Sequence, residues 1–255
     1  MSAGPSAEGP RVSLVVPVYD EVECLPGLLD EIREAMSRQG RPYEVVLVDD
    51  GSQDGSGELL DRRAGEDSQL VVLHLVRNSG QTAAFIAGFR RARGEVVVTL
   101  DADGQNPPSE IPRLLEAMEP GVDLVAGYRR RRQDSAWRKL QSRIANAVRN
   151  RLSRETIRDT GCSLKAIRSE FLRDFPPFHG MHRFIPTLCR LAGARRVVEV
   201  PVDHRPRQGG RSKYGMLNRV VRSFVDLLAV RWMQSRWLRF HVRPAAGETR
   251  PRDVS

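Results

Sequence analysis

Short apolar runs alternate with helical periodicities through the first half of the chain. Four runs rich in branched apolar side chains are typical of strands buried on both faces: residues 12–18, 43–48, 70–75 and 95–100. A helical spacing follows the first run and stops at a glycine, carried by Leu25, Leu28, Leu29, Ile32, Met36 and Gly40. Further helices are predicted around Leu59 and Leu60 and over residues 81–92 and 112–118. This alternation with short connections predicts an α/β fold, a mostly parallel sheet with helices on both faces.

The second half is more polar and more basic. A short strand at residues 123–127 precedes an arginine run and a polar helix that extends to about Leu152. The motif RDTGCSLKAIR predicts a turn that enters a strand or a helix, and residues 195–202 predict a late strand. A basic, glycine-rich loop and one long helix from Met216 to about Phe240 follow. We expect a single folded domain over residues 11–215, a basic amphipathic helix over 216–241, and flexible tails at 1–10 and 242–255.

Acidic residues gather where two of the predicted strands end. Asp49 and Asp50 follow one strand in VDDGSQDGS, and Asp101 and Asp103 follow another in LDADGQ. The carboxyl ends of parallel strands share one edge of the sheet, where ligands bind in such folds.

The second cluster has the composition of a divalent-metal site. The carboxylates of Asp101 and Asp103 and the amide oxygen of Gln105 are hard ligands suited to Mg²⁺ or Mn²⁺, which often share their shell with phosphate oxygens. The alternative is a capped turn. Asp49 can accept a hydrogen bond from a base N–H or a ribose hydroxyl, and the alternative there is a solvated turn in which Asp54 caps the next helix.

Charge and composition narrow the function classes. The net charge of +9 and the pI of about 10.3 favour anionic partners. A nucleic-acid-binding module is disfavoured because basic residues are not interleaved with aromatic ones, which total 6%. A dinucleotide-dependent dehydrogenase is disfavoured because no Gly-x-Gly-x-x-Gly follows the first strand. The three scattered cysteines fit a reducing cytosol, and with no signal peptide or apolar membrane span predicted, we expect a soluble or peripheral protein.

Five motifs together carry a family resemblance: VVPVYDE, VDDGS, GQTAAFIAGF, LDADGQNPP and RDTGCSLK. Their order resembles that of inverting glycosyltransferases of the GT-A fold, most of all the polyprenyl-phosphate (dolichyl-phosphate mannose synthase-like) subgroup, over roughly residues 12–215. The resemblance implies a Rossmann-like sheet and transfer of a sugar, with inversion and with Mg²⁺ or Mn²⁺, from a GDP- or UDP-linked donor to a polyprenyl phosphate. Two departures are YDE, where many relatives carry Asn-Glu, and Gly104, where leucine is frequent.

The same resemblance implies roles for individual residues. The donor nucleotide is expected at Pro17, Tyr19, Glu21, Asp49 and Asp101, and the metal at Asp101, Asp103 and Gln105. The acceptor phosphate is expected at Arg129, Arg138, Ser142 and Arg207, and the catalytic charges at Asp103, Arg129, Arg207 and Lys213. Arginine suits these places because its planar fork meets phosphate oxygens bidentately. Flexible surface loops and a solvated basic face are the alternatives for the arginine-rich segments.

A lipid monophosphate is already anionic at neutral pH, so the expected reaction needs little general-base assistance. His74, His179, His182, His204 and His241 show no ligand pairing, and we interpret His182 and His204 as structural or loop residues. The nearest alternative is an inverting transferase with a saccharide or protein acceptor in cell-envelope glycan synthesis. It would need a carboxylate base, for which Asp159 is the candidate.

The long C-terminal helix mixes tryptophans and aliphatic residues with arginines. Such a helix can lie in a membrane interface, where arginine meets anionic headgroups. The alternative is packing against its own domain or a second subunit. Many similar synthases carry membrane-spanning helices after this point, and none is predicted within this sequence. We therefore expect a peripheral protein on the cytoplasmic face of the membrane, with a membrane-anchoring partner subunit or a homo-oligomer as further possibilities.

Overall fold

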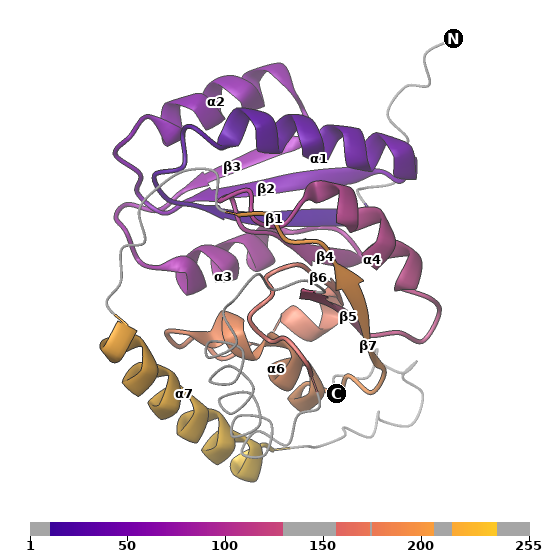
Figure 1. Cartoon of the computed structure of the whole chain (residues 1–255), viewed down its shortest axis with the longest axis vertical. Coiled ribbons are helices and arrows are strands. Elements are labelled where there is room, and N and C mark those ends of the chain that lie inside the picture. The colour runs from indigo at the N-terminus through magenta and orange to yellow at the C-terminus, as the bar shows by residue number, and fades with distance from the viewer. Residues whose placement is uncertain (1–10, 130–156, 174, 207–215, 239–255) are drawn as a thin grey trace, which may run out of the picture.

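A seven-stranded sheet forms the centre of the protein, in the order β3-β2-β1-β4-β6-β5-β7 (Figure 1). The computed structural model describes residues 11–129, 157–173, 175–206 and 216–238. The strands are β1 Val12–Val18, β2 Tyr43–Asp49, β3 Leu70–His74, β4 Val96–Thr99, β5 Leu124–Arg129, β6 Lys165–Arg168 and β7 Val197–Val202. β6 pairs antiparallel with β4 and β5, and the other pairs are parallel. The mostly parallel α/β sheet is therefore confirmed.

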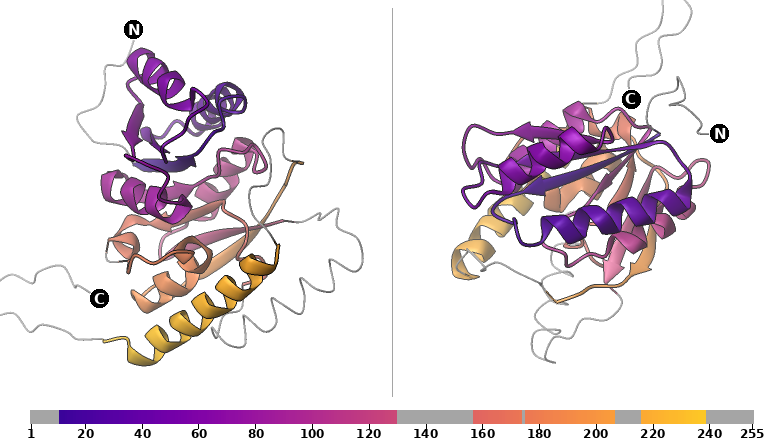
Figure 2. Two further views of the ribbon diagram at one scale, coloured as in Figure 1. Left: turned by 90° about the vertical axis from the view of Figure 1, so that its left-hand side faces the viewer. Right: turned by 90° about the horizontal axis from the view of Figure 1, so that it is seen from above.

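Helices cover both faces of this sheet (Figures 1 and 2). α1, α2 and α4 pack on one face, and α3, α6 and α7 pack on the other. The helices are α1 Leu25–Gln39, α2 Ser56–Glu66, α3 Gln81–Arg91, α4 Ile111–Ala117, α6 Ile185–Leu191 and α7 Met216–Arg236. Short 3₁₀ turns lie at η1 Pro108–Glu110, η2 Ser169–Leu172 and η3 Met181–Phe184.

The two hydrophobic layers meet at the central strand β1. Val12, Leu14, Val16 and Val18 pack into the layer beneath α1, and Val15 packs into the layer beneath α3. Because β1 is flanked by β2 and β4 and covered on both sides, its side chains are almost all apolar. This burial is the physical reason for the branched apolar runs in the sequence.

Several details differ from the sequence-based expectations. The strand within RDTGCSLKAIR is β6, which inserts antiparallel between β4 and β5. The short helix α6 has no counterpart among the predicted elements. Asp54 is not the cap of α2, whose N-cap is Gly55, although the Asp54 carboxylate still accepts the Ser56 N–H at 3.0 Å.

The long C-terminal helix is present as α7, which ends at Arg236. Its inner face is anchored by Leu227 and Val230, both buried in the layer that contains α6. Among the helices that the structure describes, none is long and apolar enough to cross a membrane. The polar helix predicted up to about Leu152 lies outside the described residues.

A buried carboxylate fixes the edge of the sheet where β4 begins. Glu44 is 2% exposed and accepts hydrogen bonds from the Ser13 hydroxyl at 2.7 Å and from the Arg93 N–H at 2.7 Å. The Arg93 guanidinium also pairs with Glu44 at 3.0 Å. The loop between α3 and β4 is thereby tied to β1 and β2, and this tie positions the strand that leads into Asp101.

Gly88 allows α3 to lie directly on β1. A Cβ at this position would lie 2.3 Å from Cγ1 of Val15, which is fully buried. The small-residue face of α3 is therefore required by close helix–sheet packing.

We predict opposite stability changes for two Gly→Ala substitutions in helices. Gly88→Ala should lower the free energy of unfolding by roughly 1–3 kcal/mol because the new methyl group overpacks the contact with Val15. Gly65→Ala on α2 is the matched control: no atom lies within 4 Å of its Cβ position, so only helix propensity changes, and stability should rise by up to about 1 kcal/mol. Urea denaturation measures both, and equal effects of the two substitutions would contradict the packing argument.

Candidate functional site

The carboxyl ends of β1, β2, β4 and β5 lie at one edge of the sheet, because these strands run in the same direction. The described residues to which the sequence assigns donor, metal or acceptor contacts lie on or shortly after these ends: Pro17, Tyr19, Glu21, Asp49, Asp101, Asp103, Gln105 and Arg129. The fold therefore collects on one edge groups that are far apart in the chain.

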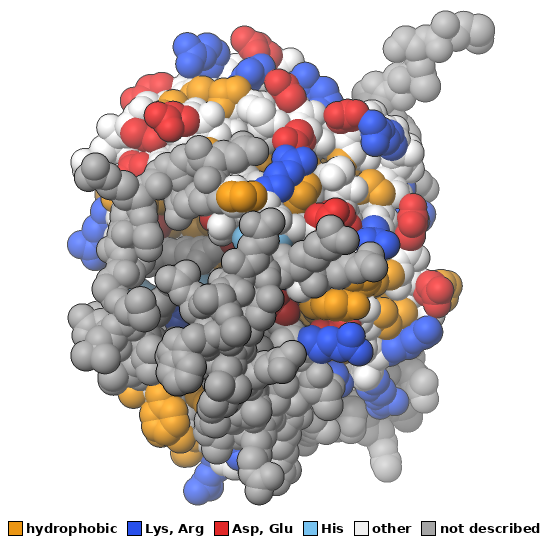
Figure 3. Space-filling view, viewed as in Figure 1, with side chains coloured by type: hydrophobic (Ala, Val, Ile, Leu, Met, Phe, Trp, Pro, Cys, Tyr) orange, Lys and Arg blue, Asp and Glu red, His pale blue; other side chains and the backbone are white. Residues whose placement is uncertain are grey.

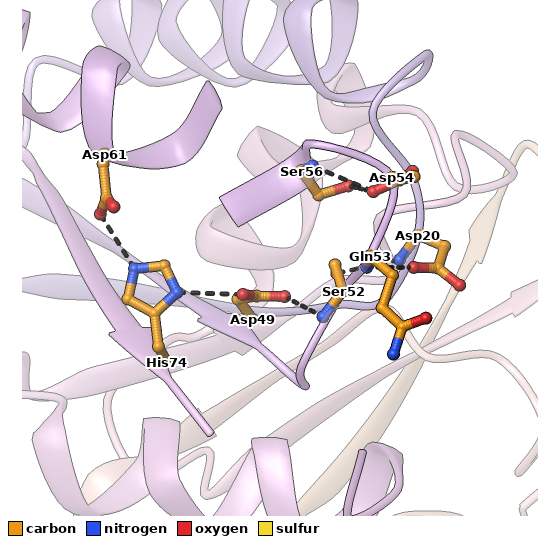
Figure 4. Close-up of polar contacts among 8 residues, drawn as sticks. All are labelled: Asp20, Asp49, Ser52, Gln53, Asp54, Ser56, Asp61 and His74. Atoms are coloured by element: carbon orange, nitrogen blue, oxygen red, sulfur yellow. Dashed lines mark hydrogen bonds and ion pairs between the residues drawn. The ribbon is translucent and has the colours of Figure 1, made fainter. Parts of the chain in front are cut away.

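The loops after β1 and β2 are held together by hydrogen bonds between side chains and backbone. Asp20 N–H donates to the Ser52 hydroxyl at 3.0 Å, and the Asp20 carboxylate accepts the Gln53 N–H at 2.8 Å (Figure 4). Glu21 N–H donates to the Ser56 hydroxyl at 3.0 Å. Asp20 has a φ of 51°, in the left-handed region that aspartate and asparagine tolerate. The role of Asp20, which the sequence leaves open, includes this local structural one.

Asp49 is buried and its two oxygens have different partners. Oδ1 accepts the Ser52 N–H at 2.9 Å, and Oδ2 lies 3.0 Å from Nδ1 of His74. Burial opposes ionisation of this carboxyl, but the hydrogen bonds from Ser52 and His74 outweigh it and lower its pKa. Asp49 is thus an ionised acceptor, and each oxygen keeps a further lone pair.

His74 is a member of this cluster that the sequence analysis missed. Its Nε2 lies 2.9 Å from Oδ1 of Asp61 on α2, so the ring bridges two carboxylates (Figure 4). Hydrogen bonds to Asp49 and Asp61 raise its pKa. His74 and Asp49 are register partners in β3 and β2. In the sequence, only an alignment of the ends of the apolar runs that form β2 and β3 would have indicated this contact.

Asp50 orders the connection between β3 and α3. Its oxygens accept the backbone N–H groups of Ser79 at 2.7 Å and Gly80 at 2.8 Å. Burial raises the Asp50 pKa, and the neighbouring Asp49 charge adds to this. Gly51 has a φ of 73° and approaches the backbone of this connection so closely that a Cβ would lie 2.8 Å from Asn78 N. The first residue of α3, Gln81, is thereby placed to donate to Asp101 Oδ1 at 2.7 Å.

Asp101 and Asp103 form a turn with excess negative charge. Burial, with the Asp103 charge as the next cause, raises the pKa of Asp101 to about 6. The Asp103 carboxylate accepts the Gln105 N–H at 3.1 Å, which closes the turn. Two neighbouring carboxylates, one of which has a raised pKa, form a suitable donor set for a hard divalent cation. Within the described ranges, no three or more His, Cys, Asp or Glu side chains converge into a metal-binding group.

A polar layer supports this turn from below. The Thr99 hydroxyl donates to the Ser163 carbonyl at 2.5 Å, and the Asn106 amide donates to the Ser163 hydroxyl at 2.8 Å. Lys165 on β6 is 2% exposed and donates to the Cys162 carbonyl. Burial lowers its pKa, while the charge of Asp101 opposes that shift. Lys165 stands in the motif RDTGCSLK, but the motif alone does not indicate that its ammonium group is buried beside the acidic turn.

Arg129, at the end of β5, forms a bidentate ion pair with Asp159. Its Nε lies 2.6 Å from Oδ2 and its Nη2 lies 2.9 Å from Oδ1. The arginine expected to bind phosphate and the carboxylate considered as a general base are therefore each other's partners.

A strap after β7 lies against the acidic turn. Arg205 N–H donates to the Gln105 carbonyl at 2.8 Å, and the Arg205 guanidinium pairs with Glu31 on α1 at 2.8 Å. The remaining predicted basic and acceptor residues lie outside the described residues: Arg138, Ser142, Arg207 and Lys213.

His182 contacts the first turn of α3. Its Nδ1 lies 2.9 Å from the Thr82 hydroxyl, whose oxygen also accepts the Gly180 N–H at 3.1 Å. The interpretation of His182 as a structural residue stays a prediction.

Comparisons with known proteins identify relatives of the chain. It is 44% identical over 218 residues to the undecaprenyl-phosphate 4-deoxy-4-formamido-L-arabinose transferase of Edwardsiella ictaluri, and 42% identical over 219 residues to the enzyme of that name from Yersinia pestis. These matches cover 85% and 86% of this chain. They cover 66% of each relative, so the chain matches slightly less than two thirds of their length.

Solved structures share the architecture. A mannosyltransferase from Pyrobaculum calidifontis in complex with GDP-Man and Mn²⁺ matches with a TM-score of 0.60 and 24% identity, over 90% of this chain and 65% of the other. Glucosyl-3-phosphoglycerate synthase from Mycobacterium tuberculosis in complex with Mn²⁺ and UDP-Glc matches with a TM-score of 0.63 and 20% identity, over 88% of this chain and 79% of the other. The fold is the GT-A fold.

The family assignment agrees with the sequence motifs and with the fold. Residues 13–175 match the family described as glycosyl transferase family 2, which is more than half of the 255-residue chain. The matched range runs from β1 past β6 and includes both acidic strand ends. The chain belongs to glycosyl transferase family 2.

Proposed function

We propose that this protein transfers a sugar, with inversion, from a nucleotide-sugar donor to a polyprenyl phosphate, using Mg²⁺ or Mn²⁺. The observation that carries the proposal is the placement of the Asp101–Asp103 turn beside the Asp49 cluster at one edge of the sheet. The named relatives act on undecaprenyl phosphate and 4-deoxy-4-formamido-L-arabinose, which makes these the first acceptor and sugar to test.

The donor nucleoside is assigned to the linked loops after β1 and β2. Asp49 is ionised and can accept N–H or O–H groups, and Pro17, Tyr19 and Glu21 at the end of β1 are assigned to the same nucleoside. The hydrogen bonds between the two loops hold these groups in place before a ligand arrives, which reduces the entropy lost on binding.

The donor diphosphate is assigned to the Asp101–Asp103 turn, with Gln105 as the third oxygen ligand of the cation. When bound, a divalent cation neutralises the diphosphate as it leaves. Gln81 orients Asp101 at 2.7 Å, and the Gln105 N–H orients Asp103 at 3.1 Å. Further positive charge is assigned to Arg207 and Lys213, which lie beyond the described residues.

The acceptor phosphate is assigned to the region of Arg129, with Arg138, Ser142 and Arg207 as further contacts outside the described residues. Asp159 orients the Arg129 guanidinium through two hydrogen bonds. A carboxylate held in this way is a poor candidate for the base that a saccharide or protein acceptor needs. The pairing therefore favours a phosphate acceptor, which supplies its own anionic nucleophile.

The outer face of α7 supports peripheral binding to the cytoplasmic face of the membrane. Among its described side chains from residue 224 onward, the large apolar ones that are exposed are Phe224 at 50%, Val225 at 58%, Leu228 at 48% and Trp232 at 65%. Figure 3 shows apolar side chains gathered over α7, at the lower left of that view. Aromatic and aliphatic side chains beside arginines such as Arg231 and Arg236 suit an interface with anionic lipid. A homo-oligomer or an anchoring subunit is the other occupant to test.

We predict that Asp103→Ala abolishes transfer without unfolding the protein. Loss of a metal ligand should lower the rate by at least roughly 100-fold, because the charge on the leaving diphosphate is no longer neutralised. The assay combines polyprenyl phosphate with UDP- and GDP-linked sugars in Mn²⁺. Glu116→Gln, an exposed carboxylate on α4, is the control and should keep normal turnover. Full metal-dependent turnover in Asp103→Ala would refute the assignment.

Asp101 should make the metal-free protein less stable as pH rises. Its pKa is raised from 3.8 to about 6, so the folded state binds the proton more tightly than the unfolded state does. The stabilisation is complete below the unfolded value and is lost as pH rises through about 6. At about pH 7.5 in EDTA, Asp101→Asn should therefore be more stable than the wild type by up to about 3 kcal/mol, and the difference should vanish near about pH 4.

The same variant should lose the thermal stabilisation that Mn²⁺ and UDP or GDP give to the wild type. Asp103→Asn is a useful comparison in EDTA, because it removes the neighbouring charge and should give a smaller gain. Equal stability of Asp101→Asn and the wild type across the pH range would contradict the argument.

The α7 face is tested with phosphatidylglycerol vesicles. Phe224→Ser, Leu228→Ser and Trp232→Ser combined should weaken co-sedimentation by on the order of tenfold or more, because apolar area no longer enters the interface. Val76→Ser, at a fully exposed apolar residue elsewhere, is the control and should have no effect. Undiminished sedimentation of the triple variant would exclude this face, and a change from dimer to monomer would assign it to a second copy.

A further inference from the structure

His74 lies between two carboxylates that belong to different elements. It ends β3, and its register partner Asp49 ends β2. Nδ1 lies 3.0 Å from Oδ2 of Asp49, and Nε2 lies 2.9 Å from Oδ1 of Asp61 on α2 (Figure 4). The Asp49 side chain is 7% exposed, the His74 side chain 42% and the Asp61 side chain 65%, so the bridge runs from the interior to solvent.

The geometry of the bridge selects one protonation state of the ring. A neutral imidazole has a single N–H, whereas ionised carboxylates only accept hydrogen bonds. Both contacts are satisfied together only when both ring nitrogens carry protons. We infer that His74, as an imidazolium, is a positioning residue that fixes the Asp49 carboxylate for the donor nucleoside and makes nucleotide binding weaken as the ring loses its proton.

The position of Asp49 depends on this contact because His74 is the hydrogen-bond partner of Oδ2. Ser52 also holds the carboxylate, through its N–H at 2.9 Å from Oδ1 and through its side chain. The Cβ position of Gly57 on α2 lies 3.0 Å from Oδ2, so this helix allows the approach by carrying no side chain there. With His74 in place, the remaining lone pairs of Asp49 have fixed directions.

The positive charge of His74 favours nucleotide binding in addition to its effect on the position of Asp49. Asp49 adjoins the buried Asp50, and the proposed donor brings a diphosphate to the same edge of the sheet. A cation at His74 offsets part of this negative charge. The charged groups that act on the ring are Asp49 from β2 and Asp61 from α2, and hydrogen bonds to both raise its pKa. The ring therefore keeps its proton to a higher pH than an unperturbed histidine.

The inference rests on the proposed function, since it needs a nucleotide at Asp49. Calorimetric titration with UDP and with GDP in Mg²⁺, from about pH 6.5 to about pH 8.5, tests it in the full chain. Wild-type affinity should fall by on the order of tenfold across this range, because the neutral ring keeps one N–H and no longer gives Asp49 a charged donor while it also donates to Asp61. Ionisation of Asp101 and of the nucleotide phosphate strengthens metal and nucleotide binding as pH rises, so those groups do not produce this fall.

Two variants separate positioning from a merely structural role. His74→Gln replaces a titrating ring with an amide, so binding should be several-fold weaker at about pH 6.5 and the fall with pH should disappear. Asp61→Asn removes only the outer carboxylate, so the midpoint of the fall should move to lower pH while binding at about pH 6.5 changes little. A structural role would change stability in either variant but would not change the shape of the profile.

A second readout does not depend on affinity. Imidazole NMR titration of the wild type should show the His74 pKa rising when the nucleotide binds, as linkage requires, with His74→Gln identifying its signals. If nucleotide binds but His74→Gln keeps the wild-type pH profile, the inference is wrong and the proposed function stands. If neither nucleotide binds at any pH, both are overturned.

Discussion

The interaction on which the site depends is the hydrogen bond between an aspartate and the backbone N–H groups of a neighbouring loop. The parallel strands of the sheet end at one edge and concentrate carboxylates there. Asp20 and Asp54 link the loops after β1 and β2, and Asp50 holds the loop before α3. Each of these charges is balanced by peptide dipoles from another part of the chain. Asp101 instead receives the side chains of Gln81 and Ser163, and these donors leave its pKa raised to about 6. Of the carboxylates in this region, Asp101 is therefore the one whose ionised form a bound cation would stabilise most.

Much of the fold could be predicted from the sequence, because burial leaves a local pattern. The branched apolar run over Val12–Val18 coincides with β1, and the helical spacing up to Gly40 coincides with α1. The antiparallel insertion of β6 between β4 and β5 could not be predicted. Strand order depends on which edges pair across the fold, and a four-residue strand such as Lys165–Arg168 does not carry that information.

The site residues also separate into those with a local sequence pattern and those whose contacts depend on strand pairing. Asp101 and Asp103 are recognisable because carboxylates two residues apart form a local motif. The His74–Asp49 contact joins residues 25 positions apart and depends on strand register.

Arginines are easy to find in the sequence but hard to assign: their abundance indicates anionic partners, but it does not say which arginine binds a partner. Arg129, assigned to phosphate from the sequence, is paired with Asp159 within the chain, and Arg205 is paired with Glu31. The pairing of Arg205 instead holds the strap after β7 beside the acidic turn.

The two ends of the proposed donor site differ in the sign of the charge that they need. At the nucleoside end, His74 supplies positive charge from within the chain, and it does so while protonated. At the diphosphate end, the charge of Lys165 does not offset the effects of burial and of Asp103 on Asp101, whose pKa stays raised to about 6, so the cation proposed there requires that Asp101 has lost its proton. Rising pH therefore weakens one end as it prepares the other. The connection from Asp50 through Gly80 to Gln81 and Asp101 joins the two ends through backbone and side-chain hydrogen bonds. A nucleotide bound across this edge would thus meet both requirements only between the pH at which Asp101 ionises and the higher pH at which His74 becomes neutral.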